Sequence, residues 1–148
     1  MTALNSGKPD VKAFFDPRTW SVQYVVADPR SKECVIIDPV LDYDEKSGSV
    51  ATRNADAMLA YVAEHGLKLT SILDTHPHAD HFSAAQYLKK KTGAPTAIGE
   101  RVVDVQRLWK DIYNFPNLAT DGSQWDRLFA HGDRFNVGDI EGHVLFSP

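Results

Sequence analysis

The most constraining feature of this sequence is a cluster of metal-ligand side chains that directly follows a short apolar segment. The cluster reads His76-Pro77-His78-Ala79-Asp80-His81. Residues 69–73 before it are typical of a buried strand, and residues 81–91 after it have the apolar spacing of a helix. The sequence therefore predicts a fold in which the end of a strand opens onto a functional site.

The pattern inside the cluster favours metal binding. Pro77 restrains the backbone to an extended form, and residues two apart on an extended chain point to the same side, which brings His76 and His78 together. We predict that His76, His78, Asp80 and His81 bind metal, and that Asp80 is also catalytic, because it can accept a proton from metal-bound water. In the alternative interpretation, Asp80 only caps the next helix and each histidine is an ordinary polar residue, which leaves the clustering unexplained.

The composition predicts one globular domain and excludes two classes of partner. The chain has 148 residues, of which 43% are apolar, and a formal net charge of −4. Its basic side chains are scattered apart from Lys89-Lys90-Lys91, so the basic patch of a nucleic-acid-binding protein is missing. No apolar stretch approaches the roughly 20 residues that cross a membrane, and the start of the chain lacks the apolar core of a secretory signal. We expect a cytoplasmic protein without nucleic-acid or membrane partners.

Cys34 is the only cysteine, so the chain cannot form an internal disulfide. It lies in the apolar run 34–37, which is typical of a core strand. A single cysteine also suits a reducing compartment. We predict a buried structural cysteine rather than a reactive thiol.

Apolar periodicity and turn residues predict alternating strands and helices. Strand composition is found at 11–15, 21–27 and 34–37. The next expected elements are a polar loop at 41–50, a helix at 53–65 ended by Gly66, the strand 69–73 and the helix 81–91. After these we expect a strand at 95–99, a helix at 100–110, a loop at 114–126, and strands at 134–137 and 142–146 around Gly138. The fold class is therefore α/β or α+β.

The segment Thr75-His76-Pro77-His78-Ala79-Asp80-His81 resembles the signature of the metallo-β-lactamase superfamily, and it follows a short strand as it does there. Asp38 is similar to the aspartate that ends an early strand in this family, and residues 131–138 resemble its Gly-Asp turn. The resemblance implies the αββα sandwich of the superfamily, of which this chain would form the first half only.

Two stretches, 15–24 and 80–85, resemble the persulfide dioxygenase branch, including its rhodanese-associated bacterial members. Glyoxalase II-like thioesterases usually have a pair of small glycines where this sequence has Ser83-Ala84-Ala85. The resemblance implies oxidation of a low-molecular-weight persulfide, such as glutathione persulfide, to sulfite in sulfide detoxification. The alternative activity is that of a hydroxyacylglutathione hydrolase, which cleaves a thioester of glutathione.

These two activities imply different metal centres. Hydrolases of this fold bind one Zn²⁺ through residues matching His76 and His78 and a second Zn²⁺ through those matching Asp80 and His81. Persulfide dioxygenases resemble mononuclear Fe²⁺ enzymes that use the residue matching His76 with a later histidine and a later aspartate. In that case His78, Asp80 and His81 orient the ligands. Fe²⁺ is therefore the expected cofactor, with dinuclear Zn²⁺ as the alternative.

The resemblance runs from about residue 11 to residue 148 and covers a little over the first half of the family domain. In relatives, a Gly-His-Thr element and later aspartate and histidine ligands follow this point. His131 and His143 are the remaining candidates for a third imidazole here, and we expect structural roles for both. The chain is expected to end before the downstream ligands, which leaves a third hypothesis, an inactive half-domain. An uncovered sheet edge would also allow a homo-oligomer.

Overall fold

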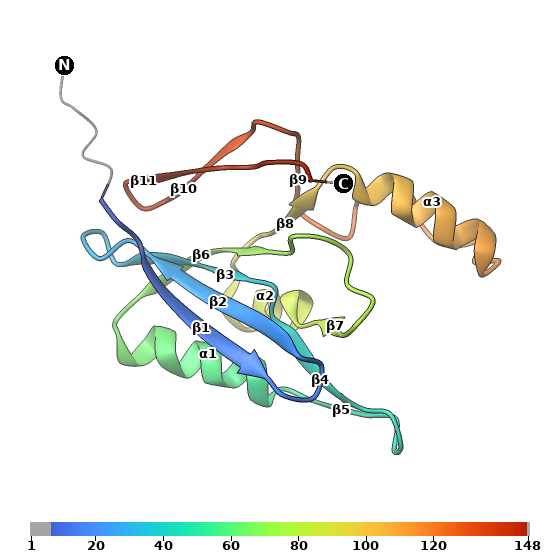
Figure 1. The fold of residues 1–148 in the computed structure, drawn as a ribbon, viewed down its shortest axis with the longest axis horizontal. Coiled ribbons are helices and arrows are strands. Elements are labelled where there is room, and N and C mark those ends of the chain that lie inside the picture. The colour runs from blue at the N-terminus through green and yellow to red at the C-terminus, as the bar shows by residue number, and fades with distance from the viewer. Residues whose placement is uncertain (1–6, 148) are drawn as a thin grey trace.

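A mixed sheet forms the centre of the computed structural model, which describes residues 7–147 (Figure 1). In spatial order its strands are β1 (Asp10–Asp16), β2 (Ser21–Ala27), β3 (Glu33–Ile37), β6 (Lys68–Leu73), β8 (Thr96–Gly99) and β9 (Arg127–Phe129). The first three are antiparallel, and β3, β6, β8 and β9 are parallel. Because the carboxyl ends of parallel strands meet at one edge, the segments that follow β3 and β6 lie close together.

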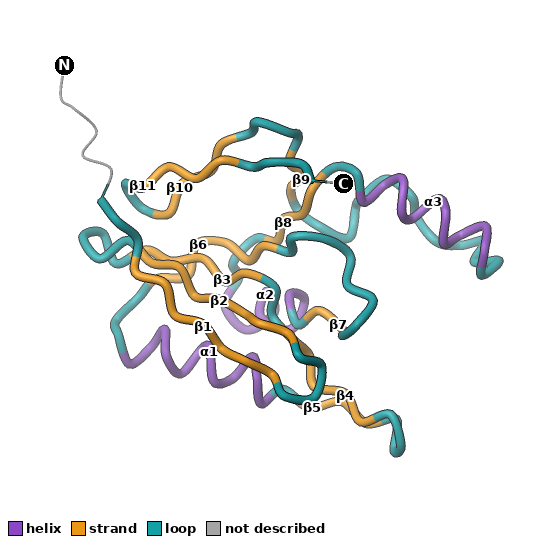
Figure 2. Tube along the Cα trace, viewed as in Figure 1, coloured by secondary structure: helices purple, strands orange, loops and turns teal. Residues whose placement is uncertain are grey.

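Helices connect the parallel strands, and two of them cover one face of the sheet (Figures 1 and 2). The helices are α1 (Arg53–Glu64), α2 (Ala85–Thr92) and α3 (Val102–Ile112). α1 and α2 supply the helical side of the larger core. The hairpin of β10 (Arg134–Val137) and β11 (Ile140–His143) packs on the opposite face. The molecule is therefore layered, with helices, sheet and hairpin in that order, and the predicted mixed α/β class is confirmed.

The side chains of β3 show how one strand supports both layers. Cys34 and Ile36 pack with Met58 of α1 on the helical side, whereas Val35 packs with Val137 of β10 on the other side. Successive residues of a strand point to opposite faces, and all three β3 side chains are fully buried. The predicted burial of Cys34 is confirmed. Burial raises the pKa of its thiol to about 11, which disfavours the reactive thiolate.

Most predicted elements are present, but three predictions were wrong. The expected loop 41–50 is a hairpin of β4 (Val40–Asp44) and β5 (Ser49–Ala51), closed where the Asp44 carboxylate accepts the backbone N–H of Lys46 and Ser47. The helix expected from 81 begins at Ala85, because β7 (Phe82–Ser83) first pairs with β4. The last strand is Ile140–His143 rather than 142–146, because Gly138, at φ +58°, makes the turn tight. The short strand β9 was not predicted.

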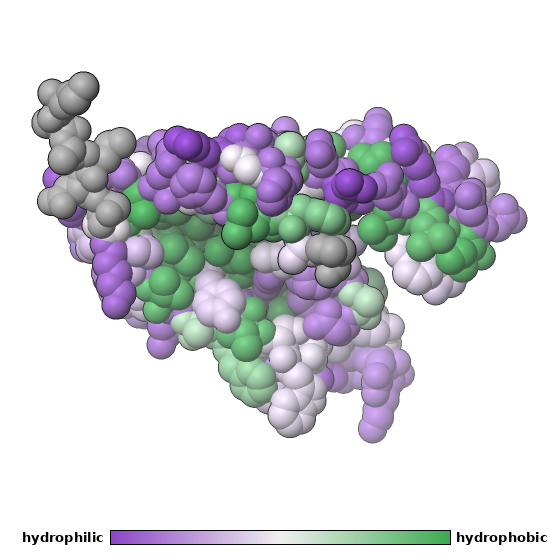
Figure 3. Space-filling view, turned by 45° about the horizontal axis from the view of Figure 1, so that its top comes forward, coloured by the Kyte–Doolittle hydropathy of each residue, from purple (hydrophilic) through white to green (hydrophobic). Residues whose placement is uncertain are grey.

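Large apolar side chains of α3 are exposed in the described part of the molecule (Figure 3). Leu108, Trp109, Ile112 and Tyr113 are each between 41% and 59% exposed. Trp109 stacks on Tyr113 with ring centroids 5.2 Å apart. The end of α3 therefore presents a continuous apolar surface rather than scattered apolar residues.

Within residues 7–147, no helix has the length and apolar character needed to cross a membrane.

A buried carboxylate at the β2–β3 turn holds the β10–β11 hairpin against the sheet. Asp28 is 1% exposed and accepts the backbone N–H groups of Arg30 and Asp139, each at 2.9 Å. Gly138 lies against the same carboxylate, since a Cβ added there would lie 2.5 Å from Asp28 Oδ2. Asp28 therefore joins two parts of the chain that are far apart in sequence.

We expect Asp28→Asn to lower the melting temperature at neutral pH, with a difference from the parent protein that shrinks in acid. The hydrogen bonds from the backbone of Asp139 and Arg30 lower the pKa of Asp28 from 3.8 to about 2. A carboxyl with a lowered folded-state pKa stabilises the fold above its unfolded pKa of about 3.9 and loses that contribution as the pH falls toward the folded value. Thermal unfolding of both proteins from neutral pH down to about pH 2 measures the effect.

Asp104→Asn in the exposed first turn of α3 is the matched control, since the contacts of its carboxylate within residues 7–147 are surface ion pairs with Arg101 and Arg107. A melting-temperature difference for Asp28→Asn that is the same at every pH would contradict the assigned role of the carboxylate.

Candidate metal centre

The predicted ligands lie in the loop that follows β6, at the edge where the parallel strands end (Figure 2). β6 ends at Leu73, and the motif occupies the irregular segment 74–81 before β7. Asp38, which follows β3, lies beside this loop because its backbone N–H donates to the Leu73 carbonyl at 2.8 Å. Its backbone has the left-handed φ of +53°, a conformation that aspartate tolerates better than most residues. The strand ends therefore bring Asp38 to the motif.

The structure brings three of the four predicted ligands into one group. Single ligand atoms of His76, His78 and Asp80 lie within 4.8 Å of one another. The ring centroid of His78 is 4.3 Å from that of His76 and 4.1 Å from that of His81. The side chains of His78 and His81 are only 5% and 2% exposed, whereas His76 is exposed.

Asp80 is not a helix cap, because α2 begins at Ala85 and its N-cap is Ala84.

Asp38 and Thr75 fix the orientation of His76. The Thr75 hydroxyl lies 2.7 Å from Asp38 Oδ2 and 2.8 Å from His76 Nδ1. A carboxylate only accepts hydrogen bonds, so the hydroxyl proton goes to Asp38. His76 Nδ1–H must then donate to the hydroxyl oxygen, and in the neutral ring this leaves a lone pair on Nε2. Support of this kind is typical of a metal-binding histidine.

Asp38 also fixes His78. His78 Nε2 donates to Asp38 Oδ1 at 3.0 Å, so the opposite nitrogen, Nδ1, is the one available to a ligand, and it faces Asp80 Oδ1 at 3.8 Å. Burial lowers the pKa of His78, but the hydrogen bond to Asp38 and the charges of Asp38, Asp74 and Asp80 outweigh it and raise the pKa. The environment of His78 Nδ1 therefore favours a positive charge.

His81 has a ring nitrogen that is well placed to bind a ligand. Its Nδ1 lies 3.2 Å from Ser21 Oγ and 3.3 Å from Asp80 Oδ2. Its Nε2 is the only buried side-chain nitrogen or oxygen within residues 7–147 that lacks a hydrogen-bond partner. Burial, together with the charge of His78, lowers the pKa of His81 and so favours the neutral ring. An unpaired buried nitrogen is costly unless a metal or another group binds it.

The donor set therefore fits a metal ion. Three imidazoles have one nitrogen held by a neighbour and the other available, and Asp80 adds a carboxylate. Burial opposes the effect, but hydrogen bonds from Ser21 and His81 lower the pKa of Asp80 to about 2, so this carboxylate is ionised. Nitrogen and oxygen donors of this kind suit zinc, iron or manganese, and the donor set does not choose among them.

A second group of possible ligands, Asp38, Asp74 and His78, is better explained as support for the first. Asp74 is buried and accepts the Ser83 hydroxyl at 2.8 Å and the Trp125 indole N–H at 3.0 Å. Burial raises its pKa. His78 Nε2 already donates to Asp38 and lies 3.9 Å from Asp74 Oδ1. The carboxylates of Asp38 and Asp74 therefore already accept hydrogen bonds from protein groups, and these bonds hold the motif in place.

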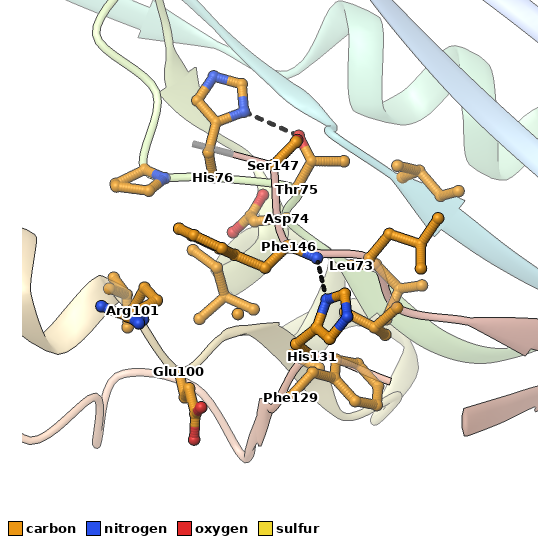
Figure 4. Close-up of a pocket in the computed structure, with 18 of the residues that line it drawn as sticks. Leu73, Asp74, Thr75, His76, Glu100, Arg101, Phe129, His131, Phe146 and Ser147 are labelled. Atoms are coloured by element: carbon orange, nitrogen blue, oxygen red, sulfur yellow. Dashed lines mark hydrogen bonds between the residues drawn. The ribbon is translucent and has the colours of Figure 1, made fainter. Parts of the chain in front are cut away.

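A cavity of about 460 Å³ opens beside His76 (Figure 4). Its wall includes His131 and His143, the two remaining histidine candidates. His131 Nδ1 accepts the backbone N–H of Phe146 at 3.0 Å, and His143 Nε2 lies 3.2 Å from Glu141. Both histidines therefore have partners of their own, although they face the same cavity as His76.

Sequence reasoning missed Ser21, Asp74 and Trp125 as parts of the site. Asp74 directly precedes the motif, so its position in the sequence could have indicated a role. Ser21 and Trp125 come from the start of β2 and from the loop before β9, and no local pattern connects either of them with the motif. Their roles depend on contacts made across the fold.

Comparison with known proteins decides the family. The model of the metallo-β-lactamase superfamily matches residues 19–145, which includes the motif and its supporting residues. The chain belongs to the metallo-β-lactamase superfamily. It is 69% identical over 140 residues to a β-lactamase hydrolase-like protein of Xylella fastidiosa, covering 95% of this chain and 32% of that protein. It is 36% identical to the mitochondrial persulfide dioxygenase ETHE1 of Mus musculus over 97% of this chain and 45% of that protein.

The superfamily fold is also found in a solved structure. The crystal structure of ETHE1 from Myxococcus xanthus matches 89% of this chain and 45% of its own length, with a TM-score of 0.64 and 29% identity. The chain thus spans between about a third and a half of the length of these relatives. The predicted superfamily and its fold are confirmed, and superfamily members are generally metal-dependent enzymes.

Proposed function

We propose that this chain forms part of a persulfide dioxygenase that binds one Fe²⁺ through His76. The observation that carries the proposal is the difference among the motif histidines. His76 is exposed and lines the cavity together with His131 and His143, whereas the side chains of His78 and His81 are 5% and 2% exposed, hold hydrogen bonds to neighbouring side chains and line a separate pocket with Asp80. A metal that reacts with dioxygen and a thiol substrate must be reachable from a cavity. His76 would therefore hold the metal on the side of the cavity that it shares with His131 and His143, while His78, Asp80 and His81, held by one another and by Asp38 and Ser21, would shape its surroundings.

The segment after the motif supports the same branch. Glyoxalase II-like enzymes usually have small glycines here, but this chain has Ser83, Ala84 and Ala85. Ser83 donates to Asp74, and both alanines are buried in the core on the helical side of the sheet, so each side chain has a role that glycine could not fill. Similarity to ETHE1 adds to this support. The other iron ligands would come from the portion of the relatives that this chain does not cover.

The proposed reaction converts a low-molecular-weight persulfide, dioxygen and water into a thiol, sulfite and two protons. The outer sulfur of the persulfide is oxidised and dioxygen is reduced. Bound Fe²⁺ would supply the binding and activation of dioxygen. His76 would hold the metal through Nε2; Asp38 and Thr75 fix the His76 ring, and the cavity beside it would take the substrate.

A second candidate function is the dinuclear zinc hydrolase of glutathione thioesters. It is favoured by the unpartnered His81 Nε2, which together with the ionised Asp80 could hold a second metal. In this case Asp80 would be a ligand and a possible proton acceptor for metal-bound water. The hydrolase-like name of the Xylella relative is consistent with this candidate.

We expect a full-length protein that contains this chain together with the downstream ligands to hold about one iron per chain and to consume dioxygen with glutathione persulfide, releasing sulfite, whereas the 148 residues alone should show no turnover. Metal content is measured by elemental analysis, and activity with an oxygen electrode and a sulfite assay. Removal of iron with a chelator should stop oxygen consumption, and Fe²⁺ should restore it. About two zinc ions per chain with hydrolysis of a glutathione thioester would instead establish the second candidate.

A further inference from the structure

Ser21 reaches the metal motif from a different part of the chain. It is the first residue of β2, and its hydroxyl lies 2.9 Å from Asp80 Oδ2 and 3.2 Å from His81 Nδ1. Fifty-nine residues separate it from Asp80 in sequence. Ser21 is thus placed between the carboxylate and the imidazole that end the motif.

The turn before Ser21 is built to hold it there. Asp16 at the end of β1 accepts the backbone N–H groups of Arg18 and Thr19 and the Thr19 hydroxyl. The Thr19 hydroxyl in turn lies 2.8 Å from Ser21 Oγ. Trp20 has a φ of +61°, which a bulky residue adopts only when the surrounding structure imposes it. The β1–β2 turn therefore fixes the position of the Ser21 hydroxyl.

The hydrogen bonds of Ser21 determine which nitrogen of His81 carries the proton. A serine hydroxyl has one proton and can accept further hydrogen bonds, whereas an ionised carboxylate can only accept. The Ser21 hydroxyl therefore donates to Asp80 Oδ2, and its oxygen accepts from the Thr19 hydroxyl. The contact between Ser21 Oγ and His81 Nδ1 is then favourable only if Nδ1–H donates, and Asp80 Oδ2, at 3.3 Å from Nδ1, favours the same tautomer.

We propose that Ser21 is a positioning residue for the metal motif, whose hydroxyl holds Asp80 and keeps neutral His81 in the tautomer with an unprotonated Nε2. That nitrogen is buried and has no hydrogen-bond partner in the described part of the chain, so its lone pair is available. Only the metal-affinity part of this inference rests on the proposed function, and there on the dinuclear candidate, in which His81 binds a metal. The tautomer can be measured in the metal-free protein whatever the reaction is.

The first test measures the tautomer directly. Metal-free protein with ¹⁵N-labelled histidine is studied by long-range ¹H–¹⁵N correlation at about pH 8, where an ordinary imidazole is neutral. Ser21→Thr and Ser21→Val form a matched pair, because both side chains are β-branched and of similar size but only threonine keeps a hydroxyl. We expect one Nδ1–H tautomer for His81 in the parent and in Ser21→Thr, and a mixture of tautomers in Ser21→Val.

The second test measures metal affinity with Zn²⁺ alone as the probe. Ser21→Val is expected to weaken Zn²⁺ binding by roughly 10- to 100-fold relative to Ser21→Thr, as is usual when support for a ligand is lost. Ser49→Ala is the control, since this exposed hydroxyl contacts only Ser47 within the β4–β5 hairpin. Far-ultraviolet circular dichroism verifies that each variant is folded, and Ser21→Ala replaces the valine variant if that one does not fold. The same His81 tautomer with and without the hydroxyl, or equal Zn²⁺ affinity for the matched pair, would overturn the assignment of Ser21.

Discussion

Replacing His76 by alanine is expected to remove the bound metal and reduce activity to the background level. His76 is a direct ligand in both the iron and the zinc hypotheses, and it is the motif histidine in the wall of the cavity that also contains His131 and His143. The Thr75 hydroxyl contacts His76 Nδ1, and Asp38 in turn accepts that hydroxyl. Both groups lie on the Nδ1 side of the ring, so neither can replace Nε2 as a ligand. Elemental analysis and the oxygen-consumption assay measure the two effects in the same preparation.

His65→Ala is the matched control for this variant. His65 caps the end of α1, is exposed, and bonds through Nδ1 only to the carbonyl of Tyr61 in the same helix. Its loss should leave metal content and activity unchanged. A His76→Ala protein that retains both metal and activity would contradict the iron and the zinc assignments together.

Asp38→Ala is expected to lower the free energy of unfolding by about 3 kcal/mol and to weaken metal binding by roughly 10- to 100-fold. The carboxylate accepts three hydrogen bonds, from Thr75 N at 2.7 Å, from the Thr75 hydroxyl at 2.7 Å and from His78 Nε2 at 3.0 Å. The variant leaves these donors unpaired and places alanine at a φ of +53°, which adds backbone strain. Chemical denaturation and Zn²⁺ titration measure the two effects.

Asp38→Asn separates the contributions of charge and backbone. Asparagine tolerates the left-handed conformation and keeps one acceptor oxygen, so we expect it to retain more stability than alanine but still to bind metal weakly. Asp104→Ala on the surface of α3 is the control, and it should change stability by less than about 0.5 kcal/mol. Unaltered metal affinity in both Asp38 variants would show that Asp38 supports the fold without orienting the motif.

Local pattern was sufficient for most of the helices and core strands and for the residue types of the motif. Residues 21–27 are both the predicted strand and the observed β2, and 53–65 contains α1, because side-chain spacing along a strand or helix is a local property. The hairpin 40–51 was not predicted, since its polar strands are stabilised by pairing with each other and with β7 rather than by an apolar face. The start of α2 was misplaced for the same reason.

The sequence by itself determined the superfamily, the mixed α/β class and the four motif residues that could bind metal, because these depend on residue types at fixed short spacings. Only the tertiary structure decided which of them are buried and which nitrogen each imidazole has available. Ser21 lies 59 residues from Asp80, Asp38 lies 40 from His78, and Trp125 lies 51 from Asp74. Contacts over such separations leave no periodic signal in the chain, and they form only when the sheet brings its strand ends and turns to one edge.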